Sequence, residues 1–147
     1  MKIAEIKVSF KEQIQVKDTP IISSSKDAFN CFWQSWNHDE IEMRESFYLM
    51  LLNRANHVKG IMEVFKGGVS STPIDAKLIF SIALKTLSSG IIVAHNHPSC
   101  SLTPSQPDIQ ITRKLREGGK LLDISVLDHL IITPEQKFYS FADEGMM

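Results

Sequence analysis

Apolar residues along the chain form short runs that are typical of strands. Residues 46–52 and 90–94 are almost continuously apolar, which predicts two strands buried on both faces. Residues 57–65 follow a turn at 53–56 and predict an antiparallel partner for the first of these strands. Residues 124–132 predict a further strand, and residues 136–141 predict its hairpin partner across the turn at 133–135.

Apolar stripes at helical spacing predict three helices between these strands. The first helix follows the caps offered by residues 23–25, and the second is capped by Asp75 and runs to about Leu87. The third follows Asp108 and stops at Gly118 and Gly119, a typical C-terminal signal. The residues expected to face the core are, in chain order, Phe29, Phe32, Trp33 and Trp36; Leu78, Ile79, Ile82 and Ala83; and Ile109, Thr112 and Leu115.

The N-terminal residues also follow a strand pattern. Ile6, Val8 and Phe10 alternate with polar residues, which predicts one more strand. We therefore expect residues 1–40 to form a strand-and-helix extension packed on the rest of one domain, residues 1–147. The order strand, helix, hairpin, helix, strand, helix, hairpin predicts an α/β fold with a mixed β-sheet flanked by helices.

The charge balance argues against a surface that binds phosphate backbones. With 16 Lys and Arg against 17 Asp and Glu, the formal net charge is −1, and no basic cluster stands out in the sequence. The alternating N-terminus predicts neither a signal peptide nor a membrane span. The chain has two cysteines, Cys31 and Cys100, and we expect Cys31 in the core. Two cysteines far apart in the sequence indicate a protein of a reducing compartment rather than one held together by disulfides. Together these features predict a cytoplasmic protein.

Two histidines one residue apart follow the predicted strand 90–94. Because successive strand side chains alternate between faces, His95 and His97 point the same way from the strand's end. A proline-rich loop follows and can return the carboxylate of Asp108 towards both imidazoles. Two imidazoles and one carboxylate make a three-ligand site of the catalytic zinc type, with the fourth position open for water. We therefore predict one Zn²⁺ per chain, held by His95, His97 and Asp108.

The same residues also have a purely structural interpretation. Ser105-x-x-Asp108 is close to a capping box, in which Ser105 caps backbone N–H groups and Asp108 interacts with the helix dipole. Capping does not explain two adjacent histidines on the same face. Asp108 can also lie in the first helical turn and still face a metal.

A hydrolytic zinc site needs a group that accepts a proton from water, and carboxylates are the usual choice. Glu45 is the preferred candidate because it lies at the entrance of the strand 46–52, and Glu40 and Glu42 are the fallbacks. The alternative for Glu45 is a solvated residue at a strand end. Ser105 can orient water or donate a hydrogen bond to the oxyanion of a tetrahedral intermediate, a role that competes with capping for one hydroxyl.

The spacing from His95-x-His97-Pro98 to Ser105-x-x-Asp108 matches the JAMM (MPN+/JAB) metalloprotease motif. The chain resembles the RadC branch of that family over almost its entire length. The segments that carry this resemblance are residues 94–99, 104–105, 127–132 and 140–145. It looks most similar to short RadC-like proteins of Bacteroidetes mobile elements, which lack the helix-hairpin-helix region of longer RadC proteins.

The resemblance implies a JAB/MPN-like α/β fold, layered as in cytidine deaminases, with zinc on His95, His97 and Asp108. By the same match Glu45 is the general base that acts on the zinc-activated water, and Ser105 assists the oxyanion. Eukaryotic members of the family cleave isopeptide bonds to ubiquitin, whereas RadC proteins carry a DNA-repair label. Neither substrate follows from these residues.

Cys100 departs from the family pattern, since RadC-like proteins usually have glycine after His-Pro-Ser. Glycine permits positive φ or close substrate approach, so Cys100 implies a tolerant backbone or a slightly altered loop. The thiol also lies near the expected metal. We expect an exposed loop residue that is not a ligand, because a fourth sulfur ligand would close the site.

The sequence leaves three candidate functions. The leading one is a zinc-dependent hydrolase of peptide or isopeptide bonds with an unknown protein or peptide substrate. The others are a nucleic-acid-processing protein of DNA repair or mobile elements, and a non-catalytic interaction module with a structural metal. The string His95-Asn96-His97 does not indicate an HNH nuclease, whose named residues are dispersed over a ββα element. Of the remaining histidines, we expect His129 in the core, with a supporting role open to it, and His38 and His57 in solvent.

Overall fold

A five-stranded mixed sheet forms the centre of the molecule, which a computed structural model describes for residues 1–67 and 74–147. The strands are β1 (Ser46–Leu52), β2 (Val58–Lys66), β3 (Gly90–Asn96), β4 (Ser125–Ile132) and β5 (Phe138–Ser140). Their order across the sheet is β2-β1-β3-β4-β5, so β2 and β5 lie at the edges. Among the strands of the described residues, only β3 and β4 pair in parallel. This parallel pair places the ends of β3 and β4 at the same edge of the sheet.

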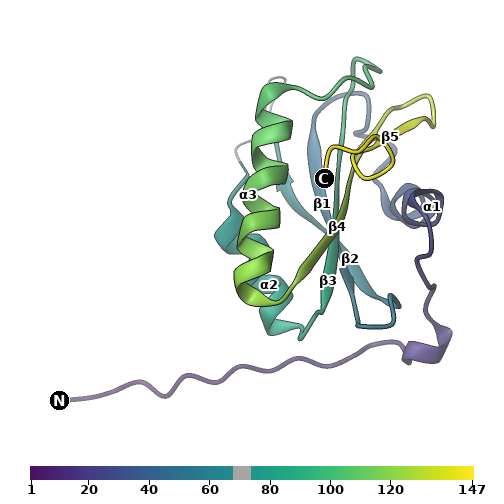
Figure 1. The fold of residues 1–147 in the computed structure, drawn as a ribbon. Helices are drawn as coiled ribbons and strands as arrows, with labels where there is room; N and C mark the ends of the chain where they lie inside the picture. The colour runs from purple at the N-terminus through teal and green to yellow at the C-terminus, as the bar shows by residue number, and fades with distance from the viewer. Residues whose placement is uncertain (68–73) are drawn as a thin grey trace.

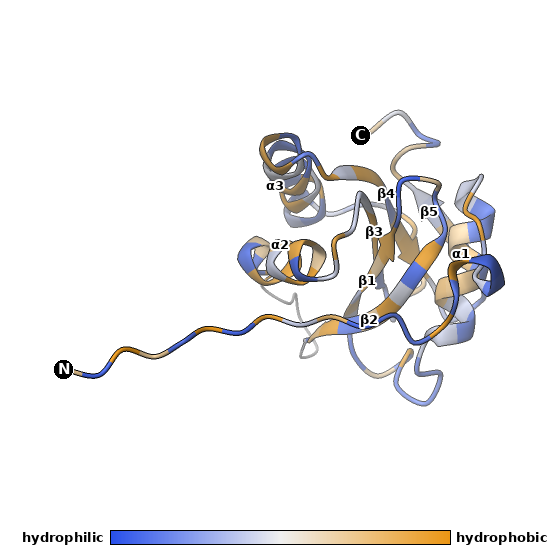
Figure 2. Ribbon diagram, turned by 90° about the horizontal axis from the view of Figure 1, so that it is seen from below, coloured by the Kyte–Doolittle hydropathy of each residue, from blue (hydrophilic) through white to orange (hydrophobic). Residues whose placement is uncertain are grey.

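Helices cover both faces of this sheet (Figures 1 and 2). Helix α1 (Ser25–Ser35) packs on one face, whereas α2 (Ala76–Lys85) and α3 (Gln106–Leu122) lie on the other. A 3₁₀ turn at Val16–Asp18 precedes α1. The expected α/β architecture of a mixed sheet flanked by helices is confirmed, and it is consistent with a JAB/MPN-like domain.

The sheet divides the apolar core into two layers, because successive side chains of its central strands alternate between the faces. Under α1 lie Met50 and Ala94, together with Phe29 and Phe32 of the helix. The α2/α3 side contains other apolar residues of the same strands, namely Phe47, Leu49, Leu51, Ile91 and Val93. Since Val93 faces α3, His95 two residues later faces the same helix.

The predicted N-terminal strand is not present. Residues 1–15 have no regular secondary structure and run away from the body of the molecule (Figure 1). Ile6 is 87% exposed and Val8 68% exposed, so these side chains bury little surface. Helix α1 does pack on the sheet, and just before it Ile22 is buried in the same core layer and Ile21 forms an isolated bridge to His57. Alternation of apolar and polar residues shows that a segment could form a strand with one apolar face, but it does not show that a neighbouring strand is available to pair with it.

Two expectations for the helices are also wrong. Helix α3 does not stop at Gly118 and Gly119 but continues to Leu122, and Asp123 ends it in the left-handed conformation, with φ 55°. The glycines serve packing, because a Cβ on Gly119 would lie 2.3 Å from the carbonyl oxygen of Ile124. Leu78 is 40% exposed instead of core-facing, since Ile79 and Ala83 define the buried face of α2. No helix in the described residues is long and apolar enough to cross a membrane.

Candidate metal centre

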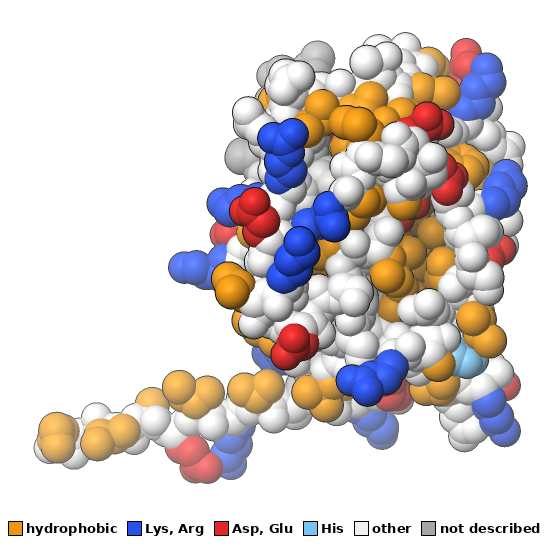
Figure 3. All heavy atoms as spheres, viewed as in Figure 1, with side chains coloured by type: hydrophobic (Ala, Val, Ile, Leu, Met, Phe, Trp, Pro, Cys, Tyr) orange, Lys and Arg blue, Asp and Glu red, His pale blue; other side chains and the backbone are white. Residues whose placement is uncertain are grey.

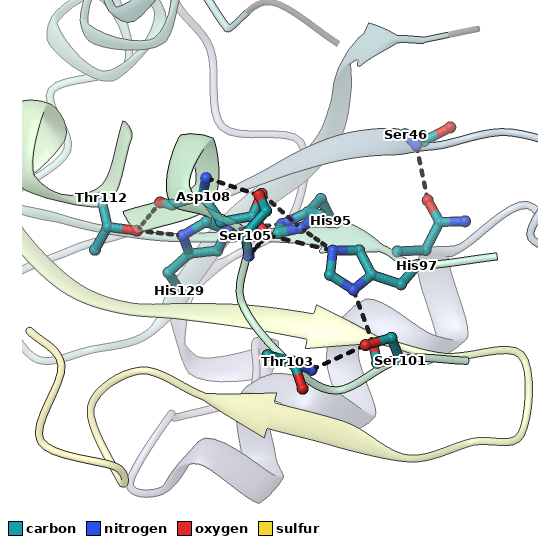
Figure 4. Close-up of polar contacts among 10 residues, drawn as sticks. Ser46, His95, His97, Ser101, Thr103, Ser105, Asp108, Thr112 and His129 are labelled. Atoms are coloured by element: carbon teal, nitrogen blue, oxygen red, sulfur yellow. Dashed lines mark hydrogen bonds and ion pairs between the residues drawn. The ribbon is translucent and has the colours of Figure 1, made fainter. Parts of the chain in front are cut away.

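His95, His97 and Asp108 converge where β3 ends and α3 begins (Figure 4). Their potential ligand atoms all lie within 4.8 Å of one another. The two Nε2 atoms are 3.0 Å apart, and the Asp108 carboxylate oxygens lie 3.2 Å from His95 Nε2 and 3.3 Å from His97 Nε2. The predicted return of Asp108 towards both imidazoles is therefore present in the structure.

The position of Asp108 depends on the start of α3. Ser105 is the N-cap: its Oγ accepts from the Asp108 backbone N–H at 3.1 Å, and Asp108 Oδ2 accepts from the Ser105 N–H at 2.8 Å. The capping box is thus formed, yet it does not compete with the cluster. The same carboxylate that closes the box also faces both histidines.

His97 is oriented by a backbone carbonyl. Its Nδ1 lies 2.8 Å from the carbonyl oxygen of Ser101, which can only accept a hydrogen bond. The proton of Nδ1 therefore points at Ser101, and Nε2 is directed at Asp108 and His95. This geometry offers Nε2 of His97 as a ligand atom.

His95 is oriented by a second imidazole. Its Nδ1 lies 2.8 Å from Nε2 of His129, a residue of β4 that is fully buried. On the other side of the His129 ring, Nδ1 lies 2.6 Å from the hydroxyl of Thr112, and Phe141 stacks on the ring face at 4.6 Å. His129 is thus a hydrogen-bonded core histidine, as expected. Its ring also supports His95 at Nδ1, the nitrogen that faces away from Asp108.

The charges in the cluster reinforce one another. Burial opposes ionisation of Asp108, but its contacts with the Nε2 atoms of His95 and His97 hold the pKa of its carboxyl well below the usual range. Burial likewise opposes protonation of His97, yet its hydrogen bonds to Asp108 and Ser101 and the nearby charges of Asp108 and Glu45 raise its pKa. Burial lowers the pKa of His129, so that this ring is neutral. Asp108 therefore presents an ionised carboxylate to the cluster.

Glu45 lies beside the cluster, at the start of β1. Phe47, two residues later, pairs with His95 across the antiparallel β1–β3 ladder. Together with His95 and Asp108, Glu45 lines a pocket of about 360 Å³ between β1 and α3. Glu40, one of the two fallbacks, instead forms ion pairs with Arg44 and Lys66. The other fallback, Glu42, is exposed and does not line this pocket.

Asn96 fastens the segment that carries Glu45. Its buried side chain accepts from the backbone N–H of Ser46 at 2.7 Å and donates to the carbonyls of Ile41 and Arg44 at 2.7 and 2.9 Å. The residue between the two histidines thus ties the entrance of β1 to β3. Sequence reasoning missed this role, although a polar residue within a buried strand end was a signal for it.

Cys100 adopts φ 66°, a backbone conformation that favours glycine. Its N–H donates to the carbonyl of His97 at 3.0 Å, which closes the turn after the histidines. The backbone therefore tolerates cysteine in the conformation expected of glycine. Among the described residues, the cluster of potential ligands consists of His95, His97 and Asp108 and does not include the Cys100 thiol.

The two remaining histidines lie apart from this cluster. His38 is exposed, as expected, and its Nε2 lies 2.8 Å from the carbonyl of Trp33. His57 is only partly exposed and contacts Thr19, whose hydroxyl lies 3.2 Å from Nδ1. Cys31 is half-buried against the core layer under α1.

Comparison with known proteins assigns the family. Residues 22–146 match the family model of the RadC-like JAB domain. A UPF0758 protein of Flavobacterium johnsoniae is 45% identical over 125 residues, which cover 85% of this chain and 53% of that protein. A UPF0758 protein of Porphyromonas gingivalis is 40% identical over 104 residues, which are 71% of this chain and 46% of that protein.

A third relative, the UPF0758 protein of Clostridium beijerinckii, is 33% identical over 147 residues, 100% of this chain and 62% of that protein. The chain spans about half the length of the first two relatives. The expected RadC-like resemblance is confirmed, and the Flavobacterium relative is consistent with the likeness to Bacteroidetes proteins. The chain belongs to the RadC-like JAB domain family, which is part of the JAMM superfamily.

Proposed function

We propose that this protein is a zinc-dependent hydrolase of the JAMM type, which cleaves a peptide or isopeptide bond. The observation that carries the proposal is the convergence of His95, His97 and Asp108 on one point, beside a pocket that Glu45 also lines. Neutral imidazoles and an ionised carboxylate are the donor set that zinc prefers in three-ligand catalytic sites. Because Nδ1 of each ring contacts Ser101 or His129, Nε2 of each ring faces Asp108, as such a site requires.

When bound, zinc at these ligands would supply Lewis acidity and lower the pKa of water to near neutrality. The proposed role of Glu45 is to accept a proton from the attacking water and to pass it to the leaving amine. Ser105 has a hydroxyl proton to offer the oxyanion, because the capping bond uses an oxygen lone pair and not the O–H. The two roles of Ser105 are therefore compatible.

The pocket next to the cluster supports a substrate with an apolar side chain near the scissile carbonyl. Its walls include Phe47, Ile74 and Ile111, and Lys114 lies among the lining residues. Partly apolar walls with few polar groups are typical of pockets that bind small organic groups. We propose that one side chain of a peptide or protein substrate occupies this space.

The test is hydrolysis of quenched peptide and isopeptide libraries by the zinc-loaded protein. We expect Glu45→Gln to lose at least about 100-fold in kcat, the usual contribution of a general base, while it retains zinc. Glu42→Gln is the matched control, because this glutamate, three residues before Glu45, is exposed and does not line the pocket. Cleavage that survives Glu45→Gln would contradict the role of Glu45. The absence of any cleavage by zinc-loaded wild type would contradict the hydrolase itself.

A second candidate function is supported by the surface of α3. Although the chain has a net charge of −1, α3 carries Arg113, Lys114, Arg116 and Lys120 against Glu117 and Asp108. Lys and Arg side chains gather over this face in Figure 3. A basic helix beside the pocket is compatible with nucleic-acid binding, which the overall charge did not favour. Salt-dependent DNA binding that is lost in Arg113→Glu/Lys120→Glu would favour this function, and the absence of such binding would contradict it.

A further inference from the structure

The two candidate histidine ligands differ in what orients them. Nδ1 of His97 faces the carbonyl of Ser101, and a carbonyl can only accept a hydrogen bond. Nδ1 of His95 faces Nε2 of His129 at 2.8 Å, and a neutral imidazole nitrogen can either donate or accept. The contact with His129 therefore leaves the tautomer of His95 open. In the metal-free cluster the Asp108 carboxylate, 3.2 Å from Nε2 of His95, is a further acceptor. On the opposite side of the ring, another group has to decide which of the two nitrogens, Nδ1 of His95 or Nε2 of His129, carries the shared proton.

Thr112 is placed to make that choice. Its Oγ1 lies 2.8 Å from the carbonyl oxygen of Asp108, one helical turn earlier, and 2.6 Å from Nδ1 of His129. The hydroxyl has a single proton, and the Asp108 carbonyl can only accept it. Oγ1 must then accept from Nδ1–H of His129. The opposite direction would leave two acceptor oxygens facing each other in a buried site.

The directions of the remaining bonds follow from this one. With its proton on Nδ1, the neutral ring of His129 has a bare Nε2 that can only accept. The proton between the two rings therefore belongs to Nδ1 of His95. His95 then directs Nε2 at Asp108 and His97, where the ligand atoms converge.

We propose that Thr112 is a positioning residue that acts through His129 to set the tautomer of His95 required for metal binding. The inference concerns how the proposed zinc site is held ready, and so it rests on the proposed function. The chain of bonds runs from the backbone of one ligand, Asp108, to the ring of another, His95. No step in it requires a change in net protonation.

The surroundings of His129 keep this arrangement rigid. The ring is fully buried, with Phe141 stacked on it at an interplanar angle of 6° and Phe47 edge-on at 5.8 Å between centroids. A fully buried ring that loses a hydrogen-bond partner has no solvent contact to replace it, so an unsatisfied N–H donor there is strongly unfavourable. Removal of the Thr112 hydroxyl should therefore change the tautomer of His129 and not merely loosen the ring.

The experiment compares Thr112→Val with Thr112→Ser. Valine has nearly the shape of threonine but no hydroxyl, whereas serine keeps it. The first readout is the tautomer of His129 in the metal-free protein, from two-bond ¹H–¹⁵N correlations of ¹⁵N-histidine-labelled protein, with His129→Gln to assign the signals. We expect the proton on Nδ1 in wild type and Thr112→Ser, and on Nε2 in Thr112→Val.

The second readout is zinc affinity by competition with a chromophoric chelator. We expect Thr112→Val to bind zinc about 10- to 100-fold more weakly, the usual effect of a lost supporting contact, and Thr112→Ser to recover wild-type affinity. Thr86→Val is the matched control. Thr86 also donates its hydroxyl to a carbonyl one turn earlier, that of Ile82, but at the end of α2. We expect both readouts to be unchanged in this variant.

An unchanged tautomer in Thr112→Val, or Nε2–H in wild-type His129, would overturn the inference. A zinc affinity that falls equally in Thr112→Val and Thr86→Val would overturn it as well, because a general loss of stability would then suffice. The tautomer is measured without metal, so failure of wild type to bind zinc would contradict the proposed function alone. A correct tautomer and tight zinc binding without hydrolysis would likewise leave this inference standing.

Discussion

Cys100 occupies a backbone conformation that is unfavourable for its side chain. Its φ of 66° lies in the left-handed region, which costs residues other than glycine about 1–2 kcal/mol. We expect Cys100→Gly to raise the free energy of unfolding by about 0.5–1 kcal/mol, because glycine's greater freedom in the unfolded chain offsets part of the relief. Urea denaturation measures this change. A destabilised Cys100→Gly would show that the thiol makes contacts worth more than the strain.

Asp128 should give the stability of the protein a measurable dependence on pH. Burial raises the pKa of its carboxyl above the ordinary 3.8, although Ser140, Ala142 and His129 donate hydrogen bonds that lower it. The folded state therefore retains the Asp128 proton to higher pH than the unfolded state does. It follows that this group's contribution to stability falls as pH rises from about 3.8 through the folded pKa.

An asparagine side chain cannot titrate, so the substitution Asp128→Asn isolates this effect. We expect the stability of Asp128→Asn relative to wild type to increase with pH across that window and then to level off. Urea denaturation of both proteins at a series of pH values measures the difference. A relative stability that decreases with pH would mean that the carboxylate is stabilised by folding, contrary to its burial.

For single residues, the sequence predicted the contacts between residues that lie close together along the chain. His95, His97 and Asp108 lie within one strand end, one loop and one helical turn, so their convergence could be inferred from the spacing. The roles of His129 and Thr112 could not, since they depend on the β3–β4 register and on the rotation of α3. Thr112 had a signal nonetheless, because it follows Asp108 by one helical turn.

Helix α3 rests on the sheet and on α2 through its two glycines. An ideal Cβ on Gly119 would lie 2.3 Å from the backbone oxygen of Ile124, and one on Gly118 would lie 2.7 Å from the Phe80 ring. At Gly119 the added Cβ would meet backbone, which cannot easily move, whereas at Gly118 it would meet a side chain. The helix can therefore approach the start of β4 closely only without a side chain at residue 119.

Gly119→Ala tests this packing against helix propensity. Propensity alone favours alanine by about 1 kcal/mol, but the clash with the Ile124 carbonyl should reverse the sign and destabilise the protein by about 1–3 kcal/mol. Gly118→Ala is the matched comparison and should destabilise less, because the Phe80 ring can shift. Thermal unfolding of both variants measures the difference. A stabilised Gly119→Ala would show that α3 does not require close approach at this point.

At the scale of elements, apolar periodicity predicted every strand of the sheet and the three helices. The strands predicted from long apolar runs are correct, because a strand that is buried on both faces has apolar residues at nearly every position. The N-terminal alternation was a wrong signal because a strand also needs a partner, and residues 6–10 pair with neither edge strand of the sheet, β2 or β5. The end of α3 was misplaced because a glycine pair serves close packing as well as helix termination.

Across the whole molecule, the N-terminal segment stands apart from the two layers of core (Figures 1 and 3). Its contacts with the body include the cation of Lys59, which pairs with Glu12 and lies over the Phe10 ring. The Lys59 side chain is 9% exposed, but its partners lie at the surface, with Glu12 37% and Phe10 41% exposed, and contacts with such partners contribute about 1 kcal/mol. We therefore expect deletion of residues 1–12 to change the free energy of unfolding by less than about 1 kcal/mol, by urea denaturation. A larger loss would mean that this segment packs on the domain, as the sequence pattern had predicted.

Titration of zinc into the metal-free protein shows whether His95, His97 and Asp108 form an open zinc site. We predict one zinc per chain in wild type, Glu45→Gln and Cys100→Gly, because neither substituted residue belongs to the ligand cluster. We predict that His97→Ala abolishes this binding or weakens it at least about 100-fold, because it removes one of three ligands. Wild type that takes up no zinc, or His97→Ala that binds it equally well, would show that these three residues do not form a zinc site.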